Sequence, residues 1–213
     1  MATTAVSEQM KNRSDNGRTR PRPTGRTVRN RVPWALCCAW LLAVTSALAG
    51  DLEFEAVKLP ALRINGQAAR AHTQGLEVID GAYYVTARRE DVVPKQPLLL
   101  RTAPNRTDWD AWDLTIEPAR DSAAAIDHPG GFQSDGKRLW IPLAESKRKG
   151  RSVIRAFLLA RMVPGQPVGA EIEFPVNDHI GAIAVSTNAG LVLGASWDTE
   201  TVYVWDTQGR LQR

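Results

Sequence analysis

The sequence predicts an all-β domain that is β-propeller-like, with about three blades' worth of four-stranded antiparallel repeats. First, the three histidines of the chain, His72, His128 and His179, each stand four residues before a large apolar residue. Second, they are spaced by 56 and 51 residues, as in propeller repeats. Third, each phrase leads to a turn signal between two β-rich stretches, such as Asp80-Gly81 or Asp135-Gly136.

Each copy of this repeat supplies a strand on either side of its turn, and further short β-rich stretches fit before the next copy. A β-sandwich is the alternative fold, because it also has short strands, but it does not explain the repeated histidine phrase. Beyond the strands that begin at the histidines, we expect strands at 82–88, 98–101 and 109–116, then at 137–145, 152–159 and 170–174, and finally at 191–197 and 201–205.

The first 49 residues have the character of a leader. Residues 1–31 are basic and polar, and residues 34–49 form an uncharged apolar run of 16 residues that ends in Ala47-Leu48-Ala49. This order is typical of a secretory signal peptide. The run is shorter than the roughly 20 residues that span a bilayer, which favours cleavage over an uncleaved membrane anchor. We therefore expect a disordered basic leader and signal peptide in 1–49, a domain in 50–213, and a secreted or periplasmic protein.

The positive charge of the chain belongs to this leader. The whole chain has a formal net charge of +4, yet residues 50–213 hold 19 basic and 21 acidic residues. Nucleic acid is therefore not an expected partner of the domain. Both cysteines, Cys37 and Cys38, lie in the apolar run, so the exported domain would have neither disulfides nor thiol chemistry.

The number of blades is small for a propeller. The strands make two full blades, part of one before His72, and three strands of a last one, whereas propellers usually close a ring of four or more blades. An open ring exposes strand edges that promote association. We expect either a piece of a longer propeller, which is the favoured interpretation, or self-association that covers the open blade edges.

Four phrases resemble a bacterial family of exported, uncharacterised propeller-like proteins, over roughly residues 70–206. They are Asp127-His128-Pro129-Gly130-Gly131, the stretch Leu139–Glu145, Asp178-His179-Ile180-Gly181 and Ala195-Ser196-Trp197. This resemblance implies a propeller-like fold and no particular activity. The repeats are also similar to those of the quinoprotein and YVTN-type propellers.

A shorter phrase, Thr73-Gln74-Gly75-Leu76-Glu77, resembles a motif of the five-bladed glutaminyl cyclotransferases. That family has an aromatic residue where His72 stands and a Ser/Gly-rich phrase where Arg88-Arg89-Glu90-Asp91 stands. The resemblance is therefore confined to one pentapeptide.

Propeller geometry predicts where the site lies. The innermost strand of each blade begins near the central axis, and the second strand returns to the same face. Small residues after each histidine would let the inner backbones approach one another there. We therefore expect the first strands to begin at the mouth of the channel, which places His72, His128 and His179 there. The ends of the second strands should surround these histidines with Arg88, Glu145 and Trp197.

Three converging imidazoles would suit zinc or another divalent metal, with one position open for water. Glu145 is then the candidate general base and Arg88 the group that holds an anionic substrate. Asp127 and Asp178 would either orient the neighbouring imidazoles or cap turns. The alternative is that each histidine only hydrogen-bonds the backbone of an adjacent blade.

We therefore expect a domain that binds a small-molecule or peptide ligand at its top face through Arg88, Glu145 and Trp197. Two alternatives stay open: a metal-assisted hydrolase or lyase that uses the histidine cluster, and a structural module for protein interaction. Metal retention would separate the enzyme from the other two. The large aromatic side chains are expected to pack between blades, namely Trp109, Trp112, Trp140 and Trp205.

Overall fold

The computed structural model of the chain describes residues 56–116 and 125–213, and this part confirms the all-β prediction. Its one helical element is a single 3₁₀ turn, η2 (Leu159–Arg161). None of the described helices is long and apolar enough to cross a membrane. The predicted leader and signal peptide, residues 1–49, lie outside the described residues.

The first blade is a four-stranded antiparallel sheet in the order β3-β4-β5-β6. Its predicted tight turn at Asp80-Gly81 has two positive φ angles, 49° and 75°, which suit the right-handed twist of a two-residue hairpin. The strands are β3 (Ala71–Ile79), β4 (Ala82–Arg89), β5 (Gln96–Thr102) and β6 (Asp110–Asp113).

The second blade is antiparallel in the order β11-β10-β9-β7, and β8 also pairs with β9. Its innermost strand is therefore divided in two, with glycines between the halves. The strands are β7 (Ile126–Pro129), β8 (Gln133–Ser134), β9 (Arg138–Glu145), β10 (Ser152–Leu158) and β11 (Ile172–Val176).

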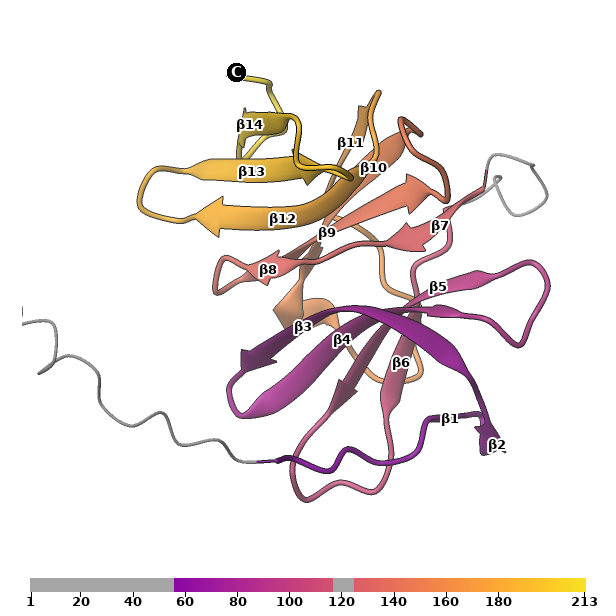
Figure 1. Cartoon of the computed structure of the whole chain (residues 1–213). Coiled ribbons are helices and arrows are strands. Elements are labelled where there is room, and N and C mark those ends of the chain that lie inside the picture. The colour runs from indigo at the N-terminus through magenta and orange to yellow at the C-terminus, as the bar shows by residue number, and fades with distance from the viewer. Residues whose placement is uncertain (1–55, 117–124) are drawn as a thin grey trace, which may run out of the picture. The chain divides into compact units, whose positions relative to one another are not determined.

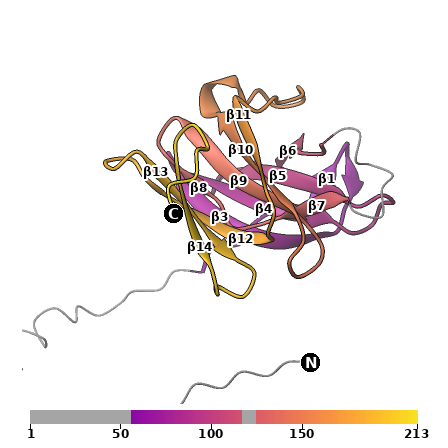
Figure 2. The same ribbon diagram turned by 90° about the horizontal axis from the view of Figure 1, so that it is seen from above.

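The third blade has three strands, β12 (Ile180–Ser186), β13 (Leu191–Ser196) and β14 (Val202–Asp206), in that order. The C-terminal residues run beside β14, because Leu211 bridges Trp205 and the backbone of residues 212 and 213 bonds to that of residue 204. A small hairpin, β1 (Arg63–Ile64) and β2 (Gln67–Ala68), precedes the first blade where the sequence predicted part of another one. In Figure 1 the second blade lies between the other two, and Figure 2 shows the same sheets from above.

Strand β9 forms the centre of the packing because both of its faces are buried. Its residues alternate in direction, so Leu139, Ile141 and Leu143 face the first blade while Trp140 faces the third. Burial of a large apolar side chain contributes about 1.5–3 kcal/mol, so both faces of this strand stabilise the contact of the second sheet with its neighbours.

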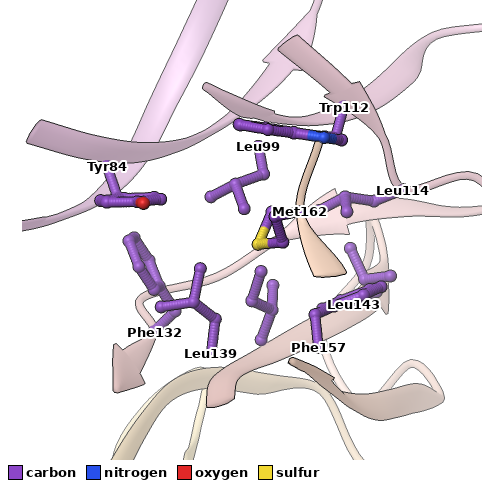
Figure 3. Packing of buried hydrophobic residues seen from close by; sticks show 10 residues of the cluster. Tyr84, Leu99, Trp112, Leu114, Phe132, Leu139, Leu143, Phe157 and Met162 are labelled. Atoms are coloured by element: carbon purple, nitrogen blue, oxygen red, sulfur yellow. The ribbon is translucent and has the colours of Figure 1, made fainter. Parts of the chain in front are cut away.

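Two apolar clusters hold the blades together. The first joins the first and second blades, and Figure 3 shows Met162 near its centre, with Trp112 on one side and Leu139 on the other. The second joins the second and third blades and contains Trp140 and Trp205. Three of the four tryptophans thus pack between blades as predicted.

The fourth tryptophan corrects that prediction. Trp109 packs against the outer face of the first blade beside Leu62 and Ile64, and its indole N–H donates to Pro60 O at 2.9 Å. It lies at the start of a predicted strand, but the strand begins one residue later, at Asp110.

The innermost strands meet through their glycines. Gly131 N donates to Gly181 O, and Gly131 O accepts from Ile183 N, both at 2.9 Å. A Cβ atom on Gly130 would fall onto Gly181 O, so only glycine fits there. The prediction that small residues let the inner backbones approach is therefore confirmed for the second and third blades.

Replacement of Gly130 by alanine should destabilise the fold. The new methyl group would force the inner strands of the second and third blades apart, and overpacking of this kind costs about 1–3 kcal/mol. Denaturant unfolding measures the change in the free energy of unfolding. Gly169→Ala is the matched control, because nothing lies within 4 Å of its added Cβ. Equal stability of the two variants would contradict the close approach.

Candidate functional site

The structure brings the three histidines together at the inner strands. His72 lies in β3, His128 lies in β7, and His179 immediately precedes β12. The ring centroids of His72 and His128 are 6.5 Å apart, and those of His128 and His179 are 5.6 Å apart. The three rings differ in exposure: His72 is exposed, His128 is partly buried, and His179 is 2% exposed.

The ends of the second strands reach the same region. The register of β3 and β4 places Arg88 opposite His72, and Trp197 N donates to His179 O at 2.8 Å. The indole of Trp197 meets the His179 ring edge-on, with centroids 4.3 Å apart. The side chain of Trp197 nevertheless remains 46% exposed, so it presents an aromatic face to solvent.

A pocket of about 180 Å³ lies among these residues. It is smaller than the sites of roughly 300–1,000 Å³ that hold drug-sized ligands, so it suits one small group. His128, His179 and Trp197 were predicted for this region, whereas the other lining residues were not named as site residues. Each of the others stands two residues after a histidine, so the repeat carried the same signal for Gln74 as for the two glycines. The complete lining is Gln74, His128, Gly130, His179, Gly181 and Trp197.

Arg88 fixes the tautomer of His128. Its guanidinium Nη1 lies 3.2 Å from His128 Nδ1. A guanidinium only donates hydrogen bonds, so Nδ1 must be the acceptor, and the neutral ring carries its proton on Nε2. Burial, followed by the charge of Arg88, lowers the pKa of His128 to about 4, while Asp127 opposes this effect. The ring is therefore neutral at physiological pH.

Arg88 is itself held in place by acidic partners. Its Nε donates to Glu90 Oε1 at 2.7 Å, its Nη1 lies 3.7 Å from Asp127 Oδ1, and Nη1 also donates to the Ser146 hydroxyl. The side chain is 13% exposed and is absent from the pocket lining. Its Nε and Nη1 are thus used within the protein, and its contact with the pocket lining is the one with His128.

His179 makes the kind of contact that the alternative to a metal site predicted, a hydrogen bond to the backbone of an adjacent blade. Its Nδ1 lies 3.0 Å from Lys147 O, in the β9–β10 loop of the second blade. A carbonyl only accepts, so Nδ1 carries the proton. Burial lowers the pKa of His179, and the backbone carbonyls of Lys147 and Glu145 oppose the shift. Asp178 caps the turn, since it accepts bonds from His179 N and the Tyr203 hydroxyl.

Glu145 ends β9, next to the basic loop Lys147–Arg151, and does not line the pocket. Its side chain is 4% exposed and pairs with Lys147 Nζ and Arg151 Nε, both at 2.8 Å. These bonds, Lys147 first, lower the pKa of Glu145 to about 2. A carboxylate of such low basicity is a weak proton acceptor. The general-base role of Glu145 stays a prediction from the sequence, and its contacts anchor the loop.

The metal hypothesis meets a chemical obstacle at His128. Among residues 56–116 and 125–213, no group of three or more His, Cys, Asp or Glu side chains is arranged to hold a metal ion. Coordination needs a free nitrogen lone pair, whereas His128 offers Nε2–H and has Arg88 on Nδ1. The metal site of His72, His128 and His179 therefore stays a prediction that requires rearrangement of Arg88.

Comparison with known proteins gives one match, to a family defined by sequence. Residues 49–212 match the Family of unknown function (DUF6454). No curated protein and no solved structure is significantly similar to the chain. The resemblances to quinoprotein-type propellers and to glutaminyl cyclotransferases stay predictions.

The contact between Arg88 and His128 predicts the titration of His128. Arg88→Met removes a donor and a positive charge from the ring, so the pKa of His128 should rise from about 4. Burial remains as the leading cause, so the new pKa should still lie below the ordinary value of 6.5. Nitrogen-15 NMR of the imidazoles measures the shift. Arg89→Met, which loses only a partner of Asp91, is the control. An unchanged pKa in Arg88→Met would exclude this coupling.

The neutral state of His128 also predicts a pH dependence of stability. Because the folded pKa is depressed, the unfolded chain binds the proton first as the pH falls below about 6.5. Stability is thus lost between roughly pH 6.5 and 4, by about 1–2 kcal/mol after allowance for the partial exposure of the ring. Denaturant unfolding across this range should show a shallower loss for His128→Asn. Parallel curves for the two proteins would argue against a buried neutral His128.

Proposed function

Since the chain belongs to the Family of unknown function (DUF6454), its site must indicate its role, and we propose that it binds a small ligand in the pocket at the inner strands. The observation that carries this proposal is the pairing of an exposed aromatic face with a polar ring of fixed tautomer. Trp197 comes from the third blade, His128 from the second and Gln74 from the first, so all three blades contribute to the lining.

Trp197 is the stacking surface of the proposed site. An indole that is half exposed beside a pocket can bury much of its area against a flat ligand, and aromatic faces contribute about 0.5–1.5 kcal/mol beyond that burial. The edge-on contact with the buried His179 fixes its orientation. This preorganisation reduces the entropy that binding would cost.

Arg88 and Glu145 support the site in this proposal without touching the ligand. Arg88 sets the tautomer of His128. Glu145 holds Lys147 and Arg151 at the ends of the basic loop, and Lys147 O in turn holds His179. Both are therefore positioning residues in this proposal, whereas the sequence predicted that they contact the ligand directly.

The sequence alone supports two further parts of the proposal, export and self-association. The signal segment favours a secreted or periplasmic domain that meets small molecules outside the cytoplasm. A second copy that covers the open blade edges is the proposed protein partner, and it would have to approach elsewhere than the free edge of β14, which Leu211 already bridges.

The test is an NMR screen of small aromatic compounds against the full chain. A ligand in this pocket should shift the indole signal of Trp197 and the ring signals of His128 together, and Trp197→Ala should weaken binding about 10-fold through loss of stacking. Trp109→Phe is the control, because that tryptophan lies on the outer face of the first blade. If shifts occurred only outside the pocket residues, the proposed site would be wrong.

A further inference from the structure

We infer that the ligand of this pocket is a small aromatic carboxylate, with its carboxylate on His128 and its ring against Trp197. This inference rests on the proposed function and names the class of ligand. It depends on four features of the described residues: the direction of the hydrogen bond at His128, the charge behind that ring, a second donor at Gln74, and the size and aromatic wall of the pocket.

The direction of the hydrogen bond follows from Arg88. Because Nη1 of Arg88 can only donate to His128 Nδ1, the free nitrogen of the neutral imidazole is an N–H donor. Among the described residues, His128 Nε2 has no hydrogen-bond partner. A group that only donates, such as an ammonium, finds no acceptor at this ring, whereas a carboxylate or carbonyl oxygen can accept a hydrogen bond from Nε2–H.

The charge behind the ring favours an anion over a neutral acceptor. The guanidinium of Arg88 lies 3.2 Å from Nδ1, and it polarises the imidazole so that Nε2–H becomes a stronger donor. Glu90 contacts the far side of this guanidinium through Nε, and Asp127 lies 3.7 Å from Nη1. Burial is the main cause of the lowered pKa of His128, the charge of Arg88 and the other two imidazoles add to it, and Asp127 opposes them.

A second donor lies beside His128. Gln74 lines the pocket, and its amide Nε2 lies 2.8 Å from His72 Nδ1. An amide nitrogen carries two hydrogens, so one remains for a second oxygen. Two oxygens of one carboxylate can therefore be bound by different blades, which is a recurring way to fix the orientation of a planar anion.

The aromatic wall and the volume limit the rest of the ligand. The rings of His128 and Trp197 have centroids 5.9 Å apart and an interplanar angle of 35°, so they form adjoining walls of the pocket. A volume of about 180 Å³ accommodates one ring with a short substituent, and the glycines Gly130 and Gly181 leave the floor without side chains. A single aromatic ring that carries a carboxylate satisfies all of these features.

The experiment uses the full chain with nitrogen-15-labelled histidine and three probes that share one ring: benzoate, benzamide and benzylamine. Near neutral pH, the two-bond proton–nitrogen spectrum should show His128 protonated on Nε2. Benzoate should shift this signal and bind about 10-fold more tightly than benzamide, because its hydrogen bond is charge-assisted. Benzylamine should cause no shift. Equal or tighter binding of benzylamine, or a His128 protonated on Nδ1, would overturn the inference.

Two variants separate the chemical class from the pocket itself. Arg88→Met should weaken benzoate about 10-fold and remove its advantage over benzamide, whereas Arg89→Met should bind like the parent chain. If benzamide or benzylamine bound at Trp197 and benzoate did not, the carboxylate inference would fail while the proposed ligand site would stand. If none of the three probes shifted His128 or Trp197, the inference would be wrong, and the wider screen would decide the proposed function.

Discussion

The close approach of the inner strands is the constraint on which the rest of the structure depends. Gly131 and Gly181 exchange backbone contacts that a side chain at Gly130 would block. Gly75 repeats this on the first blade, where a Cβ would lie 2.9 Å from Thr86 Oγ1 and 3.0 Å from Gly131 Cα. Because the backbones meet here, the histidine rings that precede the glycines lie close to one another. The large apolar side chains fill the space between the sheets.

The first and second blades each bind the histidine of the blade that follows. Arg88, at the end of β4, binds the ring of His128, and Lys147, just after β9, binds the ring of His179. The position is repeated but the chemistry differs, because one partner is a donor and the other an acceptor. The two rings consequently have opposite tautomers. A repeat that serves packing in one blade can therefore serve recognition in another.

The fold was predictable because local sequence patterns determine its strands and turns. The Asp80-Gly81 turn, the β-rich stretches and the repeated histidine phrase each depend on residues near one another in the chain, and the strands β4, β9 and β13 formed where these patterns indicated. The site was predictable in part: the equivalence of the repeats correctly placed three histidines and Trp197 near one inner region. Gln74 stands two residues after His72, as Gly130 and Gly181 do after their histidines, but only the packing of the blades shows that it lines the pocket.

The sequence by itself determined the strand-forming stretches, the turns and the glycines that allow the inner strands to meet, because backbone preference and side-chain alternation act over a few residues. Only the tertiary structure decided which residues support the pocket and which line it. Arg88 and Glu145 both lie at the end of the second strand of their blade, but Arg88 lies opposite His72, whereas Ala144 and not Glu145 lies opposite His128. Arg88 contacts His128, and Glu145 pairs with Lys147 and Arg151 instead. Charge pairing, hydrogen-bond direction and exposure depend on neighbours from other blades, and those neighbours are fixed only when the sheets pack together.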